Sequence, residues 1–261
     1  MQVDYTVAEQ KSFNRAKLIS FKRLEEFPGW VWSPNHKAYF ESFFSQHDPK
    51  TVLEIGSGAN PTLTPKYVHE HGLSYITSDV DAKELEKADP EFQRCVLDLS
   101  AQIANPDLMG KFDCILSRMV NEHISDGEQY HRNIYNMLKP GGISAHCFST
   151  LWNLPLAANR LLPEAVSEFL LQLYSPRNKH QNGKFKAYYS WSRGPSQKMI
   201  DRFEGIGFEV LQYTGYFGHN YYRTIPFLHR MEMRKAEALL KHPIPMLCAY
   251  STLILRKPSI Q

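Results

Sequence analysis

Cysteine is scarce in this chain: its 261 residues include four, and no two of them form a Cys-x-x-Cys pair. This spacing argues against a structural zinc site and indicates free, buried thiols in a reducing compartment. A continuous run of about 18 uncharged apolar residues is also missing, so no membrane span is expected. The first residues include Asp4 and no apolar core. We therefore expect no secretory leader and a cytoplasmic location.

A large excess of either charge is missing as well, since the formal net charge is +3. The charge is nevertheless uneven, because residues 151–261 are basic. One basic cluster consists of Arg177, Lys179, His180, Lys184 and Lys186. Two interpretations of this cluster stay open: a site that attracts an anionic substrate, or a solvated loop. No continuous basic face interleaved with aromatic residues is present, so a nucleic-acid partner is not expected.

The most informative segment that is present is TVLEIGSG at residues 51–58. A short apolar run predicts a buried strand, and two glycines after it allow a sharp turn against a ligand. Such a turn at the carboxyl end of a strand is where open α/β sheets bind nucleotide-like ligands. A dinucleotide-binding loop needs a third glycine at position 61, which is Pro61, so that fingerprint is broken. Glu54 lies beside the loop and is expected to hold a cationic group or to order the loop amides.

Strands and helices alternate downstream, which predicts a parallel sheet with helices on both faces. Thr64 with Pro65 and, later, Asp126 have the residue types of helix starts. Residues 1–50 are aromatic and have helical spacing. We expect strands at 51–55, 74–78, 94–97, 112–117, 142–148, 208–211 and 249–255, and helices at 38–46, 65–71, 127–138, 196–204 and 227–241.

Several of these segments, in this order, resemble class I S-adenosylmethionine-dependent methyltransferases of the small-molecule type. The resemblance is good over about residues 50–150 and looser from about 196 onward. One departure is the stretch 60–65, because family members often begin the helix directly after the second glycine. We therefore expect a longer or more rigid loop here. The matching segments are 52–58, 75–81, 95–99, 112–117 with 121–124, and 138–142.

The resemblance implies an α/β fold: a Rossmann-like, doubly wound, mostly parallel seven-stranded sheet with a helical N-terminal segment and a lid insertion. The expected organisation is an N-terminal helical cap (1–50), a cofactor-binding core (51–150), a lid or substrate insertion (151–195) and a C-terminal part of the same domain (196–261).

The resemblance also implies S-adenosyl-L-methionine as the cofactor. A carboxylate about 20 residues after the glycine loop is placed to accept hydrogen bonds from both ribose hydroxyl groups. Asp79 and Asp81 both have this position, and the resemblance favours Asp79. Asp98 has the position that usually contacts the adenine amino group, although a helix cap is its alternative role. The expected cofactor-binding residues are Glu54, Gly56, Ser57, Gly58, Asp79, Val80, Asp98, Leu99 and Ser117, the last near the sulfonium.

Catalysis is harder to assign. His123 follows the fourth strand and is either a general base or a residue that orders its loop. His219, among aromatic residues, is a second candidate at the pocket rim, whereas His146 is expected in the core. No clustered carboxylates surround His123, so no metal is expected. By position alone, the aromatic residues Trp30, Trp32 and Tyr39 are expected to close the cofactor site, and Trp152 and Trp191 to line the lid.

The expected reaction is therefore methyl transfer to oxygen or nitrogen of a small-molecule or glycan-like acceptor, anionic or aromatic in character. Methylation of RNA or protein is an alternative, although the Asn/Asp-Pro-Pro-aromatic block of amino-methylating nucleic-acid enzymes is missing after the fourth strand. The second alternative is a protein that binds the cofactor without turnover. The oligomeric state is not encoded in any motif.

Overall fold

The computed structural model describes residues 18–30, 33–103, 105–151, 186–220 and 222–259. These residues form one eight-stranded sheet in the order β1-β7-β8-β6-β5-β2-β3-β4. β8 runs antiparallel to β6 and to β7, and the other neighbouring strands are parallel. The strands are β1 (Ile19–Arg23), β2 (Thr51–Ile55), β3 (Ser74–Asp79), β4 (Gln93–Val96), β5 (Phe112–Arg118), β6 (Leu138–Ser149), β7 (Glu209–Phe217) and β8 (Tyr250–Arg256).

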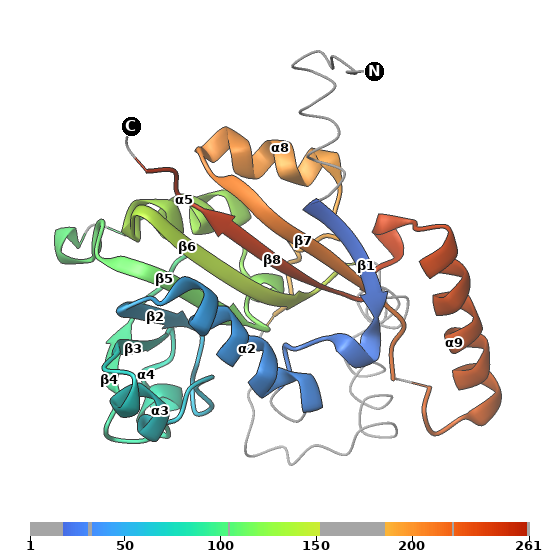
Figure 1. Ribbon diagram of the computed structural model, residues 1–261, viewed down its shortest axis with the longest axis horizontal. Coiled ribbons are helices and arrows are strands. Elements are labelled where there is room, and N and C mark those ends of the chain that lie inside the picture. Colours follow the sequence, from blue (N-terminus) through green and yellow to red (C-terminus); the bar gives the residue numbers. More distant parts are fainter. Residues whose placement is uncertain (1–17, 31–32, 104, 152–185, 221, 260–261) are drawn as a thin grey trace, which may run out of the picture.

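Helices cover both faces of the sheet, as expected of a doubly wound fold (Figure 1). Successive side chains of β2 show this directly, because Leu53 packs in one core and Val52 in the other. The first core lies beneath α5 and α8, and the second lies beneath α2. A smaller cluster lies beneath α9. The α-helices are α2 (Pro34–His47), α3 (Pro65–Glu70), α4 (Ala82–Glu86), α5 (Gly127–Met137), α8 (Gln197–Ile206) and α9 (Pro226–Lys241).

Short 3-10 helices connect several of these elements. They are η1 (Leu24–Glu26), η2 (Pro106–Leu108), η3 (Asn121–His123) and η4 (Pro245–Leu247). Two predicted helix starts are confirmed: the Thr64 side chain caps α3 with Pro65 at its first turn, and Asp126 accepts hydrogen bonds from two amides at the start of α5. None of the helices in these residues is long and apolar enough to cross a bilayer.

The α/β class and the mostly parallel sheet are confirmed, but the expected strand count of seven is wrong. The eighth strand is β1, which lies within the segment that was expected to be helical. Ser20 Oγ lies 2.8 Å from Thr214 Oγ1, and the Phe21 ring stacks on Phe217 at a centroid distance of 5.3 Å. Pairing with β7 thus stabilises an extended conformation that the local spacing does not predict, since tertiary packing overrides propensity.

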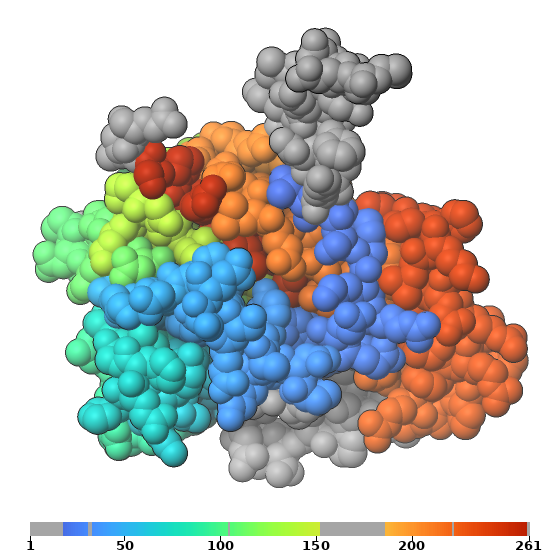
Figure 2. Space-filling view, viewed as in Figure 1, coloured from blue at the N-terminus to red at the C-terminus, as the bar shows by residue number. Residues whose placement is uncertain are grey.

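The N-terminal residues have a second role beyond β1. Residues 18–30 and α2, blue in Figure 2, cross the centre of the face shown, between the cyan residues of β3 to β4 and the orange-red α9. The Phe27 ring contacts Tyr216 and Tyr250 at centroid distances of 5.2 and 4.8 Å. These contacts attach the N-terminal residues to the antiparallel half of the sheet.

All four cysteines are free; Cys95 is half-buried and the others are buried, in keeping with the predicted free thiols. The cytoplasmic location remains a prediction.

The chain order places a crevice at one edge of the sheet. From β2 the chain proceeds outward through β3 to β4, and it then returns to β5 on the opposite side of β2. Ile55 is in register with Ser78 of β3 and with Ser117 of β5, so these three strands end at the same level. The residues that follow them therefore meet at a topological switch point, which is where ligands bind in open α/β sheets.

Candidate active site

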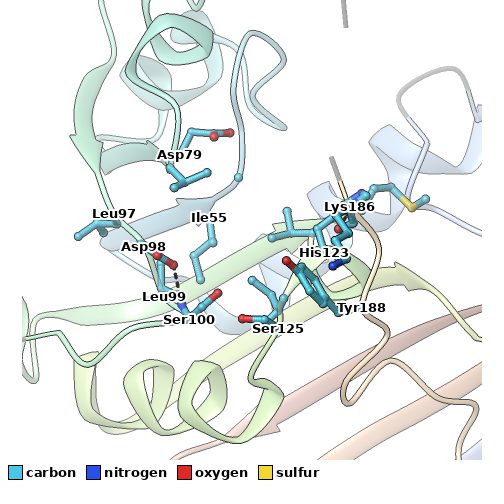
Figure 3. Close-up of a pocket in the computed structure, with 15 residues that line it drawn as sticks. Ile55, Asp79, Leu97, Asp98, Leu99, Ser100, His123, Ser125, Lys186 and Tyr188 are labelled. Carbon is cyan, nitrogen blue, oxygen red and sulfur yellow. Dashed lines mark hydrogen bonds between the residues drawn. The ribbon is translucent and has the colours of Figure 1, made fainter. Parts of the chain in front are cut away.

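A cavity of about 440 Å³ opens at this switch point. Six of the predicted site residues line it: Gly56, Asp79, Val80, Asp98, Leu99 and His123. Figure 3 shows Asp79 and Asp98 toward one end of the cavity and His123, Lys186 and Tyr188 toward the other. Its remaining lining residues are Ile55, Leu97, Ser100, Met119, Val120, Ile124, Ser125, Lys186 and Tyr188.

The glycine loop lies close to its neighbouring strands. Gly56 has a φ of +64°, and a Cβ added there would lie 2.3 Å from Val120 Cγ2, so only glycine fits. The Ser57 amide donates to the Ser78 carbonyl oxygen at 3.0 Å. A Cβ on Gly58 would lie 3.4 Å from Asp79 Oδ2. Of the three residues only Gly56 lines the cavity, and the Ser57 amide attaches the turn to β3.

Glu54 does not line the cavity; its carboxylate orders the loop that follows. It is 1% exposed, and it accepts hydrogen bonds from the Thr62 amide at 2.8 Å and the Thr62 hydroxyl at 2.6 Å. The Tyr75 hydroxyl donates to the same carboxylate. Two roles were expected for Glu54: ordering the loop amides and holding a cationic group. The structure shows the first at the Thr62 amide, and the cationic group near Glu54 is the Arg118 side chain.

Arg118, the last residue of β5, lies 3.7 Å (Nε) from Glu54 Oε1. Its guanidinium also donates to Thr62 Oγ1 at 2.6 Å, to the Asn60 carbonyl oxygen at 2.6 Å and to the Gly29 carbonyl oxygen at 3.3 Å. This side chain is 9% exposed. One arginine thus connects β5, the long loop after Gly58 and the N-terminal residues.

Asp79 and its rival Asp81 have different local partners. Asp81 is the N-cap of α4, and its side chain accepts a hydrogen bond from the Lys83 amide at 2.8 Å. Asp79 lines the cavity and accepts from the Asp81 amide through Oδ1 at 3.0 Å. Capping engages Asp81, and Asp79 is the carboxylate that faces the cavity.

Asp98 and its neighbours form the adjoining wall. Asp98 Oδ1 accepts from the Ser100 amide at 2.9 Å, which fixes the carboxylate in a local turn while it lines the cavity. Val80 also lines the cavity and is 57% exposed, so it offers an apolar surface for a flat ring. These groups fit a nucleoside: carboxylates for hydroxyl and amino donors, with an apolar side chain beside them.

His123 is the last residue of η3, which begins three positions after the end of β5. Its Nδ1 lies 3.1 Å from the carbonyl oxygen of Lys186. A carbonyl oxygen only accepts, so Nδ1 carries the proton, and in the neutral ring Nε2 carries the lone pair. A neutral imidazole held in this tautomer has the chemistry of a proton acceptor at the cavity wall.

Ser117 does not line the cavity, although it was expected near the sulfonium. It is 1% exposed; its hydroxyl donates to Asn121 Oδ1 at 3.0 Å and lies 2.7 Å from His146 Nδ1. The Tyr130 hydroxyl donates to the same Asn121 oxygen at 3.3 Å. Burial lowers the pKa of His146 well below its usual range. His146 is thus a core residue, as predicted, in a polar cluster behind η3.

His219 is also placed away from the cavity. It follows β7, which is separated from β5 by β8 and β6. Its Nε2 lies 3.3 Å from Glu232 Oε2 on α9, and its ring contacts Tyr222 at a centroid distance of 4.7 Å. Burial by itself would raise the pKa of Glu232, whereas its contacts with His219 and Lys235 lower it. The described structure therefore brings His123, and not His219, to the cofactor residues.

Of the expected aromatic residues, the three that the structure describes (Trp30, Tyr39 and Trp191) do not line this cavity. Trp30 packs on Phe27 and Tyr250, and Trp191 stacks on His131 at a centroid distance of 5.5 Å. Trp32, Trp152, Tyr221 and the basic residues 177–184 lie outside the described residues, and so does most of the expected lid. Lys186 is the described member of the basic cluster, and it lines the cavity.

Sequence reasoning did not single out Tyr188 as a site residue. It carries no motif, and only its contact with η3 brings it to the cavity.

Known proteins resemble this chain in sequence and in fold. A family model described as a methyltransferase domain matches residues 32–213. The chain is 29% identical over 182 residues to a ubiquinone biosynthesis O-methyltransferase from Chelativorans sp. (strain BNC1), covering 59% of this chain and 68% of that relative.

Solved structures resemble the fold over most of this chain. A phosphoethanolamine N-methyltransferase 2 from Haemonchus contortus, in complex with S-adenosyl-L-methionine, gives a TM-score of 0.52 at 15% identity over 90% of this chain. This chain spans 55% of that protein's length. A putative sarcosine dimethylglycine methyltransferase from Galdieria sulphuraria gives 0.53 at 11% identity, covering 87% of this chain and 86% of that one. At such identities the structures show the fold alone.

Proposed function

Because this chain belongs to the family of methyltransferase domains and takes S-adenosyl-L-methionine as its methyl donor, we propose that it methylates an oxygen or nitrogen atom of a small-molecule acceptor. The observation that carries this proposal is that Gly56, Asp79, Asp98 and His123 all line the same cavity. One end of it offers carboxylates, and the other offers an imidazole and an ammonium group. A nucleoside that carries a charged, reactive side chain suits the end with the carboxylates. A second small molecule suits the end with the imidazole and the ammonium group.

Each residue has a definite task in this proposal. The Asp79 carboxylate accepts hydrogen bonds from the ribose hydroxyls, and Asp98 accepts one from the adenine amino group. Gly56 allows close approach to the backbone, and Val80 and Leu99 exclude water around the ring. When bound, the cofactor supplies a methyl carbon that its sulfonium makes electrophilic. The protein then has to align the acceptor atom and keep water away.

His123 is the proposed proton acceptor. An alcohol or protonated amine must lose a proton as it becomes a nucleophile, and an imidazole at the cavity wall can accept it. The hydrogen bond from Nδ1 to the Lys186 carbonyl oxygen leaves the lone pair on Nε2. A nucleophile that arrives already deprotonated needs no such base, and His123 then serves to hold residues near Lys186 in place.

Two observations support a small acceptor. The acceptor and the cofactor must share one cavity of about 440 Å³, and a sequence relative is a ubiquinone biosynthesis O-methyltransferase. Lys186 and Tyr188 also give the wall opposite the carboxylates a basic and aromatic character, which suits an anionic or aromatic acceptor.

The test is incubation of the protein with methyl-labelled S-adenosyl-L-methionine and a cell extract, followed by separation of small molecules from macromolecules. We expect the label in a small molecule. Label in RNA or protein would replace the proposed acceptor class, and an absence of transfer by a cofactor-saturated protein would indicate binding without turnover. The Asp79→Ala variant is the control, because any methyl label that it transfers as well as the wild type does cannot depend on this site.

A further inference from the structure

One wall of the cavity lies opposite the proposed cofactor residues and is held in place by hydrogen bonds. It is formed by residues 186–190, which are fixed to η3 and to the start of α5. The Tyr188 and Tyr189 amides both donate to the Glu122 carbonyl oxygen, at 2.8 and 2.9 Å. The Lys186 carbonyl oxygen accepts from His123, and Ser190 Oγ accepts from the Gly127 amide at 3.1 Å. Tyr189 has a φ of +52° and is 6% exposed, so its side chain anchors the turn.

This anchoring points two other side chains at the cavity. Lys186 and Tyr188 both line it, and the Lys186 ammonium lies 5.0 Å from the centroid of the Tyr188 ring. Tyr188 is 40% exposed, so a face of its ring is available to a ligand. Lys186 forms no ion pair with any carboxylate among the described residues, whereas Arg118 is engaged by Glu54. The charges of the cavity are therefore separated, with Asp79 and Asp98 at one end and Lys186 at the other (Figure 3).

We propose that Lys186 and Tyr188 form the acceptor subsite, and that it takes a carboxylate attached to a flat, ring-bearing body. The Lys186 ammonium binds the carboxylate, and the Tyr188 ring packs on the flat part. His123, which binds the Lys186 carbonyl oxygen, then lies beside the same molecule. This inference rests on the proposed function and specifies the acceptor chemistry. The same ammonium could instead bind the carboxylate of the cofactor's amino-acid part, so the experiment must separate the two sources.

The experiment measures binding and does not need turnover. Calorimetry first compares wild-type and Lys186→Gln proteins with S-adenosylhomocysteine, which keeps the amino-acid carboxylate, and with methylthioadenosine, which lacks it. Benzoate and the neutral benzamide are then titrated into the protein saturated with S-adenosylhomocysteine, by ligand-observed NMR. Lys186→Arg retains the charge, and Lys198→Gln removes a charge from the exposed side of α8 as a matched control.

We expect both variants at Lys186 to bind S-adenosylhomocysteine as the wild type does. The wild type should prefer benzoate over benzamide by about fivefold to tenfold, the range for a partly exposed charged hydrogen bond. Lys186→Gln should abolish this preference, and Lys186→Arg and Lys198→Gln should keep it. Tyr188→Leu should weaken both probes equally, because it removes the ring contact and not the charge.

Other outcomes overturn the inference. A wild type without the preference, or a Lys186→Gln protein that keeps it, removes Lys186 from acceptor binding. Weaker binding of S-adenosylhomocysteine but not of methylthioadenosine assigns Lys186 to the cofactor's carboxylate instead. A wild type that binds neither nucleoside would contradict the proposed function itself, which is a distinct result.

Discussion

The buried pair of Glu54 and Arg118 permits a quantitative test of how the cofactor loop is held. Arg118→Met keeps much of the side-chain volume and removes the charge and three hydrogen bonds. Glu54 is 1% exposed, and it would keep only its hydrogen bonds with Thr62 and Tyr75. Removing one partner of a buried pair costs about 3–5 kcal/mol, because the other charge is left uncompensated. We expect a loss of this size in the free energy of unfolding.

Urea unfolding is the assay, with Arg132→Met as the matched control. Arg132 pairs with Glu128 at 2.6 Å on the surface of α5, and both side chains are about half exposed. An exposed pair of this kind contributes roughly 0.3–0.5 kcal/mol, so the control should scarcely change the midpoint. If Arg118→Met costs no more than Arg132→Met, then the pair does not hold the loop and the reasoning is refuted.

The double variant Glu54→Gln with Arg118→Met sharpens this test. It removes both charges, so no carboxylate is left buried alone, and its cost should be clearly less than the sum of the two single changes. A double-mutant cycle isolates this coupling, which is typically about 0.5–3 kcal/mol for residues in one network. Strict additivity would show that the two side chains act independently, in spite of the 3.7 Å contact.

Three further predictions concern the cavity and the core. Asp79→Ala should weaken S-adenosylhomocysteine binding by about 1.5–3 kcal/mol, while Asp81→Asn, which keeps the helix cap, should not; calorimetry showing equal affinities would remove Asp79 from the ribose site. His123→Gln should lower kcat roughly a hundredfold or more toward the acceptor found by labelling, and an unchanged kcat would exclude a base there. Burial lowers the pKa of His131 to about 4, so the unfolded chain binds its proton first and stability falls as the pH drops from about 6.5 toward 4. His131→Phe should reduce this slope by up to about 1.4 kcal/mol per pH unit in urea unfolding, and parallel pH profiles would contradict it.

Much of the fold can be predicted from the sequence because its signals are local. The strand at 51–55, the helix from 127 and the caps at Thr64 and Asp126 depend on neighbouring residues, and the structure has each of them. β1 is different, since its partners in β7 lie about 190 residues away and nothing in the spacing of Phe21 and Leu24 indicates them. An edge strand paired over such a distance is a tertiary event, and a periodicity argument assigns it to a helix.

The cofactor end of the site is predictable for a related reason. Parallel strands that alternate with helices bring their carboxyl ends to one edge of the sheet. Residues such as Gly56, Asp79 and Asp98 therefore lie close together because of the strand order alone. Glu54 lies next to the glycine loop, and its carboxylate contacts Arg118 and Thr62. Only the fold shows that an acid next to the glycine loop faces the protein and not the cavity.

The acceptor end follows another logic. Lys186 and Tyr188 reach the cavity through hydrogen bonds to residues more than 60 positions earlier: the His123 side chain donates to the Lys186 carbonyl oxygen, and the Tyr188 amide donates to the Glu122 carbonyl oxygen. The Tyr188 amide and the Glu122 carbonyl are main-chain groups, and every residue type offers both except proline, which lacks the amide hydrogen, so their hydrogen bond leaves no motif in the sequence. These main-chain hydrogen bonds at positions 186 and 188 do not depend on which side chains those positions carry. Acceptor specificity can therefore change there without disturbing the cofactor residues, and this makes substitutions at Lys186 the most direct probe of what the enzyme methylates.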